Sequence, residues 1–276
     1  MEIQRMNNII FECGSILEEL RKKKPLIHHI TNYVTVNDCA NITLAIGASP
    51  IMADAIEEAE AIVSISSALV LNIGTLNCRT VESMLSAGKK ANQCGIPVIF
   101  DPVGAGASEF RNETTRRILQ EVNVSVLRGN ISEIRFVAGL SSNTKGVDAA
   151  ETDASDDALN IARKLAGEQA CIVAITGATD VVSDGLNAVI IKNGHQSMSN
   201  ITGTGCMCTS LIGSFCAAAP EKMLYSTAAA ILCMGIAGEL AYDRAGELGN
   251  SSLRLAIIDA VSRMDAKAVE EKGVVG

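Results

Sequence analysis

The chain has 276 residues, of which 48% are apolar and 20% are charged, and its formal net charge is −8. This length allows one large domain or two small ones, and the apolar share suffices for a substantial core. The acidic balance argues against a nucleic-acid partner, which would require a surplus of Lys and Arg on one face.

The cysteines and the N-terminal residues bear on the cellular compartment. Nine cysteines are scattered through mostly apolar surroundings, and an odd count fits a reducing compartment better than a disulfide framework. Glu2, Arg5 and Glu12 do not resemble the start of a secretory leader. The most apolar stretch, 228–241, is short and contains Glu239, so we expect a buried helix there. The expectation is a cytoplasmic protein without a membrane partner.

The first sixty residues contain two helical patterns and two short apolar runs. The expected elements are a helix over 9–20, a strand over 26–30, a helix over 36–46, and a strand or loop over 49–52. Pro25 interrupts the first helix, and Gly47 suits the C-terminal cap of the second. Asp54 and Glu57 resemble a capping box at the start of a further helix.

From residue 69 onward, apolar runs alternate with helical patterns. The expected strands are 69–73, 97–100, 124–127 and 171–176, with helices at 77–94, 114–121, from Ile131 and at 156–166. Residues 181–185 and 188–191 predict a hairpin, and helices at 206–218, 222–242 and 252–269 complete the chain. The polar segment 141–155 has no period and is expected to be a surface loop.

This alternation predicts an α/β fold with a mostly parallel sheet. Strands that are apolar on both faces are typical of a sheet covered by helices on both sides. Because no linker-like composition and no internal repeat divides the chain, we expect a single domain over 1–276.

Ligands of open α/β sheets bind beyond the carboxyl ends of the strands. The expected strand ends carry the segments Asn72-Ile73-Gly74, Asp101-Pro102-Val103-Gly104-Ala105-Gly106, Arg128-Gly129-Asn130 and Thr176-Gly177. The glycines at 104 and 106 do not complete a dinucleotide fingerprint, because Glu109 stands where a third glycine is required. No P-loop motif is present either.

The segment Ile201-Thr202-Gly203-Thr204-Gly205-Cys206 directly precedes an apolar helical run. Such a turn directs free backbone N–H groups and the positive end of a helix at one point, which favours an anion. The alternative is an ordinary glycine-rich loop before a buried helix, and the motif alone does not decide between them.

Asp101 and Glu133 are the candidate metal ligands. Two carboxylates facing bound phosphates suit Mg²⁺, which usually takes one or two protein ligands together with water and phosphate oxygens. In the alternative interpretation, Asp101 accepts hydrogen bonds from loop N–H groups and Glu133 caps its helix. His28 and His29 are adjacent, so in a strand they point to opposite faces and are expected to be structural.

Several segments together resemble one enzyme family. They are His28-His29-Ile30-Thr31-Asn32-Tyr33-Val34, Gly47-Ala48-Ser49-Pro50-Ile51-Met52, Phe100-Asp101-Pro102-Val103-Gly104-Ala105, Arg128-Gly129-Asn130-Ile131-Ser132-Glu133, Thr176-Gly177 and Gly203-Thr204-Gly205-Cys206. In this order, from about residue 25 onward, they are similar to hydroxyethylthiazole kinases of the ribokinase-like superfamily. The resemblance implies a three-layer αβα fold and Mg-ATP-dependent phosphorylation of 4-methyl-5-(2-hydroxyethyl)thiazole in thiamine salvage. It also implies a homotrimer with substrate sites at subunit boundaries.

The resemblance assigns roles to individual residues. Gly203, Thr204, Gly205 and Cys206 would form the catalytic turn, and Arg128 and Thr176 would contact ATP. Asp101 and Glu133 would organise Mg²⁺, while Asn32, Met52 and Gly203 would line the thiazole site. The Met52 thioether suits a flat, uncharged ring.

Cys206 stands where many superfamily members carry an Asp that accepts the proton of the attacking hydroxyl. A helix N-terminus can lower the pKa of a thiol, so a thiolate base is plausible. Phosphoryl transfer nevertheless depends mainly on positioning and charge stabilisation. Our hypothesis is that Cys206 assists modestly and that the N–H groups of the turn contribute more.

Two other functions remain open at this point. One is a kinase for another thiamine or vitamin B6 precursor, such as hydroxymethylpyrimidine or pyridoxal, although the segment from His28 to Met52 argues against it. The other is a catalytically weak protein that senses ATP or the thiazole, which the absent Asp suggests.

Overall fold

The computed structural model describes residues 2–140 and 151–276. The described strands form one eight-stranded sheet in the order β2-β1-β3-β4-β5-β6-β7-β8. They are β1 (Leu26–Ile30), β2 (Ser49–Met52), β3 (Ala68–Asn72), β4 (Val98–Asp101), β5 (Val126–Asn130), β6 (Ile172–Thr176), β7 (Asp180–Ser183) and β8 (Ala188–Ile191). All pairings from β2 to β6 are parallel, whereas β6–β7 and β7–β8 are antiparallel. The predicted mostly parallel sheet and the predicted hairpin, formed by β7 and β8, are confirmed.

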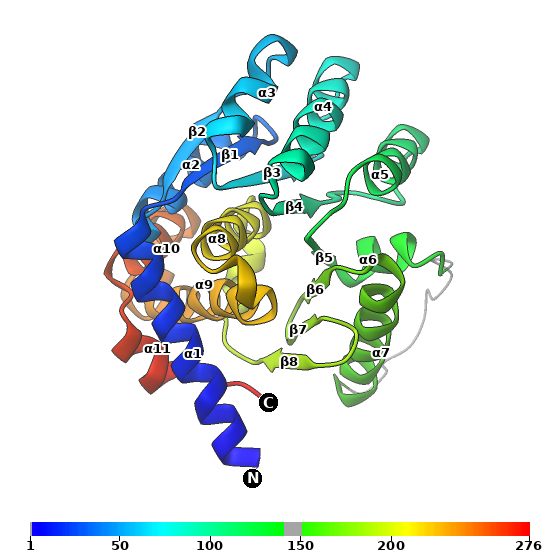
Figure 1. Ribbon diagram of the computed structural model, residues 1–276. Helices are drawn as coiled ribbons and strands as arrows, with labels where there is room; N and C mark the ends of the chain where they lie inside the picture. The colour runs from blue at the N-terminus through cyan, green and yellow to red at the C-terminus, as the bar shows by residue number, and fades with distance from the viewer. Residues whose placement is uncertain (1, 141–150) are drawn as a thin grey trace.

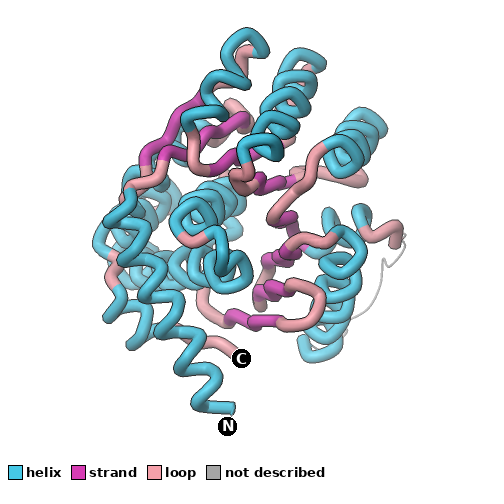
Figure 2. Tube along the Cα trace, viewed as in Figure 1, coloured by secondary structure: helices cyan, strands magenta, loops and turns pink. Residues whose placement is uncertain are grey.

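Helices cover both faces of this sheet, and each face has its own apolar core (Figures 1 and 2). One layer contains α1 (Glu2–Lys23), α2 (Val36–Ile46), α8 (Thr204–Ala218), α9 (Met223–Ala245), α10 (Asn250–Arg263) and α11 (Ala266–Lys272). The other contains α3 (Ile56–Ile65), α4 (Cys78–Cys94), α5 (Glu109–Glu121), α6 (Ile131–Val137) and α7 (Glu151–Gln169). The described residues also form the short 3₁₀ helices η1 (Gln196–Asn200), η2 (Pro220–Lys222) and η3 (Gly246–Leu248). The predicted three-layer αβα architecture is therefore confirmed.

Three local predictions were wrong. The expected capping box of Asp54 and Glu57 does not form, because α3 has Ala55 as its N-cap and no side-chain hydrogen bond there. The expected helix over 252–269 is two helices, because Asp265 caps α11 by accepting the Ala268 N–H at 2.7 Å. Helix α5 begins at Glu109, five residues earlier than expected, with Ser108 as its cap.

The expected loop over 141–155 is partly a helix. Residues 141–150 lie outside the described residues, and residues 151–155 belong to α7. The polar composition of this first part of α7 gave no apolar period from which a helix could be predicted.

Helix α9 lies inside the helical layer, as the sequence predicted. The segment Pro220–Leu248 is long and apolar enough to cross a membrane. However, 78% of its most apolar 18-residue stretch is buried inside the protein. It packs against α8 and α10, so its apolar surface is covered by protein.

Helix α8 brings the glycine-rich turn to the carboxyl edge of the sheet. It packs on β1, β3 and β4, and Gly213 permits the close approach, because a Cβ there would lie 2.6 Å from Val70 Cγ2. Since the parallel strands end at one edge, their terminal polar residues meet the N-terminus of α8.

Candidate active site

The N-terminus of α8 is open to a ligand. Its N-cap, Gly203, has a φ of 93° and no side chain caps the helix. The first bonded amide is that of Met207, which donates to the Gly203 carbonyl at 2.8 Å. The N–H groups of the three preceding residues therefore have no partner within the helix. A Cβ at Gly203 would lie 2.5 Å from Thr35 Cγ2, so glycine is required by space as well as by conformation.

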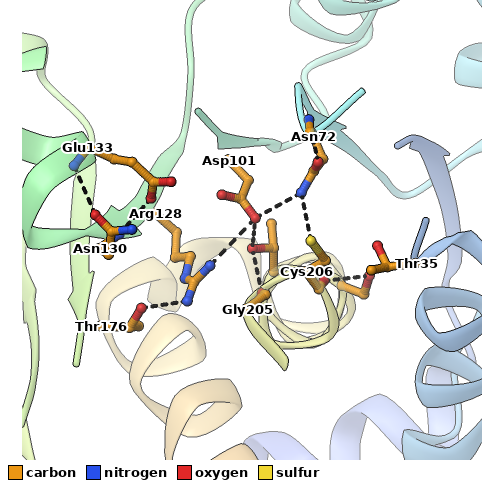
Figure 3. Close-up of polar contacts among 12 residues, drawn as sticks. Thr35, Asn72, Asp101, Arg128, Asn130, Glu133, Thr176, Gly205 and Cys206 are labelled. Atoms are coloured by element: carbon orange, nitrogen blue, oxygen red, sulfur yellow. Dashed lines mark hydrogen bonds and ion pairs between the residues drawn. The ribbon is translucent and has the colours of Figure 1, made fainter. Parts of the chain in front are cut away.

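Asp101 lies fully buried beside this turn, at the end of β4 (Figure 3). Its Oδ2 accepts hydrogen bonds from Asn72 Nδ2 at 2.9 Å and from Thr209 Oγ1 at 2.7 Å. Its Oδ1 is buried and has no hydrogen-bond partner. Burial raises the pKa of this carboxyl to about 6, although Arg128 acts in the opposite direction. The unpartnered oxygen leaves one acceptor for a ligand.

Arg128 connects Asp101 to the end of β6. Its guanidinium lies 3.5 Å from Asp101 Oδ2 and donates a hydrogen bond to Thr176 Oγ1. Burial alone would lower the pKa of Arg128, but Asp101 raises it, so the side chain stays charged. Gly205 makes room for it, because a Cβ there would lie 2.7 Å from Arg128 Nη1. The cation is thus held directly against the open helix N-terminus.

The Cys206 sulfur accepts two amide hydrogen bonds. Asn32 Nδ2 and Asn72 Nδ2 each donate to Cys206 Sγ at 3.3 Å. These donors favour a thiolate, but burial and the neighbouring Asp101 carboxylate outweigh them and raise the pKa of the Cys206 thiol. The pKa shift therefore runs opposite to the lowering that the helix N-terminus was expected to give.

Glu133 is held by backbone amides. Its Oε1 accepts the Gly104 N–H and its Oε2 the Asn130 N–H, each at 2.8 Å. Asn130 in turn accepts the Glu133 N–H, which completes a capping box at the start of α6. The contacts of Glu133 therefore match the interpretation in which it caps its helix. Each carboxylate oxygen keeps one further lone pair for a ligand.

The residues that the resemblance assigns to the thiazole site differ in whether their side chains already have hydrogen-bond partners. Asn32 is 3% exposed and fully engaged, since its Nδ2 donates to Asn72 Oδ1 at 2.9 Å and its Oδ1 accepts the Thr35 N–H at 3.0 Å. Met52 is half-buried at the end of β2, the edge strand of the sheet. Only Met52 therefore presents a side chain without polar contacts of its own.

His28 and His29 are buried in β1 and contact backbone carbonyls. His28 Nε2 lies 2.7 Å from the Ala53 carbonyl, and His29 Nδ1 lies 3.1 Å from the Ile27 carbonyl. Burial lowers the pKa of both, that of His29 to about 4. Their contacts agree with the structural role that was expected.

Sequence reasoning missed several residues that build this site. Asn72 joins Asp101, Cys206 and Asn32, and Thr209 holds Asp101. Thr209 follows Gly205 by one helical turn, so helical spacing offered a signal. Asp180 accepts the Gly177 N–H at 2.9 Å, and burial raises its pKa to about 6; no sequence pattern indicated it.

The donors fit a hard cation held together with a phosphate. Among the side chains that the structure describes, no three of His, Cys, Asp or Glu gather into a metal site of their own. The free Asp101 Oδ1 and the fixed Glu133 carboxylate fit Mg²⁺, which takes few protein oxygens and completes its shell with water and phosphate. The open N-terminus of α8 and Arg128 supply the positive charge that a phosphate requires.

Comparison with known proteins gives consistent matches over the whole chain. A family model described as the hydroxyethylthiazole kinase family matches residues 17–267. A hydroxyethylthiazole kinase of Clostridium beijerinckii is 60% identical over 268 residues, which cover 96% of this chain and 97% of that protein. One of Ruminiclostridium cellulolyticum is 61% identical, covering 97% and 98%.

Solved structures agree with these matches. A hydroxyethylthiazole kinase structure from Pyrococcus horikoshii superposes with a TM-score of 0.87 at 37% identity, covering 96% of this chain and 98% of that one. Pyridoxal kinase of Bacillus subtilis superposes with a TM-score of 0.61 at 16% identity, covering 77% and 90%, and shares the fold.

Proposed function

This chain belongs to the hydroxyethylthiazole kinase family, and we propose that it phosphorylates the hydroxyethyl group of 4-methyl-5-(2-hydroxyethyl)thiazole with ATP, a step of thiamine salvage. The observation that carries the proposal is the convergence of Asp101, Arg128 and Cys206 on the uncapped N-terminus of α8 (Figure 3). A free acceptor, a buried cation and free N–H groups at one point are what phosphoryl transfer requires.

Arg128 and Thr176 are the proposed ATP contacts. Arg128 is oriented by Thr176 and Asp101, so the guanidinium has a fixed direction before the nucleotide binds. The N–H groups of Thr204, Gly205 and Cys206 would receive the negative charge of the transferred phosphoryl group. Gly203, as the N-cap, orients these groups.

Asp101 and Glu133 are the residues that would hold Mg²⁺. When bound with ATP, the ion would neutralise charge on the phosphates. Asp101 would offer its free Oδ1, and Glu133 the remaining lone pairs of oxygens that are already fixed by Gly104 and Asn130. Because these contacts fix the carboxylate, little side-chain freedom would be lost on binding.

Met52 would pack on the thiazole ring, and Asn32 would line the site by holding the Cys206 sulfur and the turn at Thr35. Cys206 would assist the hydroxyl only modestly, because the raised pKa of its thiol leaves little thiolate to accept the proton. The N–H groups of the turn would contribute more of the rate.

We further propose a cytoplasmic homotrimer without a membrane or nucleic-acid partner. Free cysteines agree with a reducing compartment. Tyr33 and Val34 are 79% and 59% exposed and follow Asn32 directly, so apolar surface lies beside the site and would suit a subunit boundary. Light scattering should give three times the chain mass of 28.9 kDa.

One experiment separates the thiazole kinase from the alternatives. The purified protein is incubated with Mg-ATP and the thiazole alcohol, hydroxymethylpyrimidine or pyridoxal, and each product is identified by its mass. We expect phosphate on the thiazole. Product from the pyrimidine or pyridoxal alone would overturn the assignment, and ATP binding without any product would favour the sensor.

A further inference from the structure

Arg111, near the start of α5, binds three backbone carbonyls from two different strand ends. Its Nη1 donates to the carbonyls of Ile73 and Val103, each at 2.6 Å, and its Nη2 donates to the Gly74 carbonyl at 2.8 Å. Ile73 and Gly74 follow β3, whereas Val103 follows β4. A single guanidinium therefore ties together the two turns that leave these neighbouring strands.

Both turns carry residues of the active site. The turn after β3 begins at Asn72, whose Oδ1 accepts the Gly74 N–H at 2.9 Å. Gly74 also lies against Asn32, since a Cβ there would be 2.9 Å from Asn32 Cβ. The turn after β4 begins at Asp101, which is the register partner of Asn72. A shift of either turn would thus move the hydrogen bond between Asn72 and Asp101.

Further contacts fix the second turn along its length. Glu133 accepts the Gly104 N–H, and Asn112, the residue after Arg111, accepts the Gly106 N–H at 2.8 Å. Gly104 has a φ of 73°, and a Cβ there would lie 3.2 Å from Arg111 Cδ. The loop is therefore built around the Arg111 side chain.

Arg111 has no carboxylate within 4.0 Å among the described residues, although two other arginines of α5 form ion pairs. Arg111 is half-buried. Its planar guanidinium donates several hydrogen bonds in fixed directions, whereas a lysine would supply only a point charge. Its contacts are thus explained by geometry, because one rigid group holds three carbonyls on two turns.

We propose that Arg111 is a positioning residue for phosphoryl transfer. By binding the turns after β3 and β4 as a clamp, it fixes the positions of Asn72 and Asp101. This inference rests on the proposed function. Arg111 acts through the backbone and does not touch Arg128 or Thr176 directly, so its loss should lower kcat more than it raises the KM for Mg-ATP.

The test compares Arg111→Lys and Arg111→Gln with the matched variants Arg116→Lys and Arg116→Gln. Arg116 lies on the same helix, is 54% exposed and pairs with the exposed Glu109. We expect both Arg111 variants to lose at least about thirtyfold in kcat, because small misplacements in an active site cost up to about a hundredfold. The KM for Mg-ATP should rise by a smaller factor than kcat falls, and the Arg116 variants should match wild type. An Arg111→Lys variant with wild-type kcat would overturn the proposal, because charge without the planar guanidinium would then suffice.

Hydrogen exchange by mass spectrometry provides a readout that does not depend on activity. In the Arg111 variants, the segments 72–75 and 102–106 should exchange faster together, whereas the strands that precede them stay protected. Unchanged exchange in both segments would overturn the clamp, and faster exchange with unchanged kcat would overturn its role in positioning. A wild-type protein that forms no thiazole phosphate would instead overturn the proposed function, while the exchange data still report on the clamp.

Discussion

Asn72 and Asp101 end adjacent parallel strands in register, and the Asn72 amide donates to Asp101 Oδ2 at 2.9 Å. The same amide donates to Cys206 Sγ, and Asn72 Oδ1 accepts from Asn32. One buried side chain therefore couples the proposed metal ligand, the proposed catalytic turn and the proposed thiazole site.

Replacing Asn72 with its near-isostere Asp should abolish most activity. The new carboxylate would face Asp101 in a buried site, so one of the two must bind a proton, and Cys206 loses a donor. We expect kcat to fall at least about a hundredfold and the melting temperature to drop. Asn77→Asp is the control, because Asn77 is an exposed N-cap at which Asp serves equally well. Nearly wild-type kcat in Asn72→Asp would contradict the coupling.

Cys206→Ala should remain measurably active. Because burial and Asp101 raise the pKa of the thiol, little thiolate is present to accept a proton. We expect kcat to fall by less than about a thousandfold, within the range of positioning plus weak base assistance. Cys206→Ser, which keeps an acceptor for Asn32 and Asn72, should lose less than Cys206→Ala. A larger loss in the Ala variant would show that Cys206 is the principal base.

Gly205→Ala should weaken nucleotide binding without unfolding the protein. The added methyl group would lie 2.7 Å from Arg128 Nη1 and displace the guanidinium, although alanine itself favours the helix. Calorimetry should give a Kd for Mg-ATP at least about tenfold higher, the equivalent of about 1.4 kcal/mol.

Gly167→Ala is the matched control for this prediction. Gly167 lies within α7, and a Cβ there meets nothing within 4 Å. The variant should bind Mg-ATP as wild type and gain about 0.5–1 kcal/mol in the free energy of unfolding. If both glycine variants bound Mg-ATP equally well, the position proposed for Arg128 would be wrong.

Acid should destabilise the protein through His29. Its pKa is about 4 in the folded state and 6.5 as the ordinary value, so the unfolded chain binds more protons between these limits. Stability from the neutral imidazole is present above pH 6.5 and falls as the pH drops toward 4. The loss from His29 should be on the order of 2 kcal/mol by pH 5.

Urea unfolding at pH 7.5, 6 and 5 measures this effect. His29→Asn, which retains a donor for the Ile27 carbonyl, should show a smaller loss of unfolding free energy between pH 7.5 and pH 5 than wild type. Equal pH dependence in the two proteins would exclude His29 as the source.

The sequence by itself determined the architecture and the edge at which the site lies. Apolar runs such as 69–73 and 171–176 predict buried parallel strands, because only strands covered on both faces are apolar throughout. The place of Asp101 and Thr176, which end β4 and β6, and of Arg128, close to the end of β5, then follows from the geometry of parallel sheets, and Gly203 marks the start of α8.

Only the tertiary structure decided how these residues act on one another. The pKa of Cys206 depends on its burial beside Asp101, which outweighs the helix N-terminus that sequence reasoning considered. The role of Asn72 and the contacts of Arg111 with the turn after β3 depend on hydrogen bonds between segments about 30 to 130 residues apart. Local patterns report propensity and period, whereas burial and long-range hydrogen bonds exist only once the chain has folded.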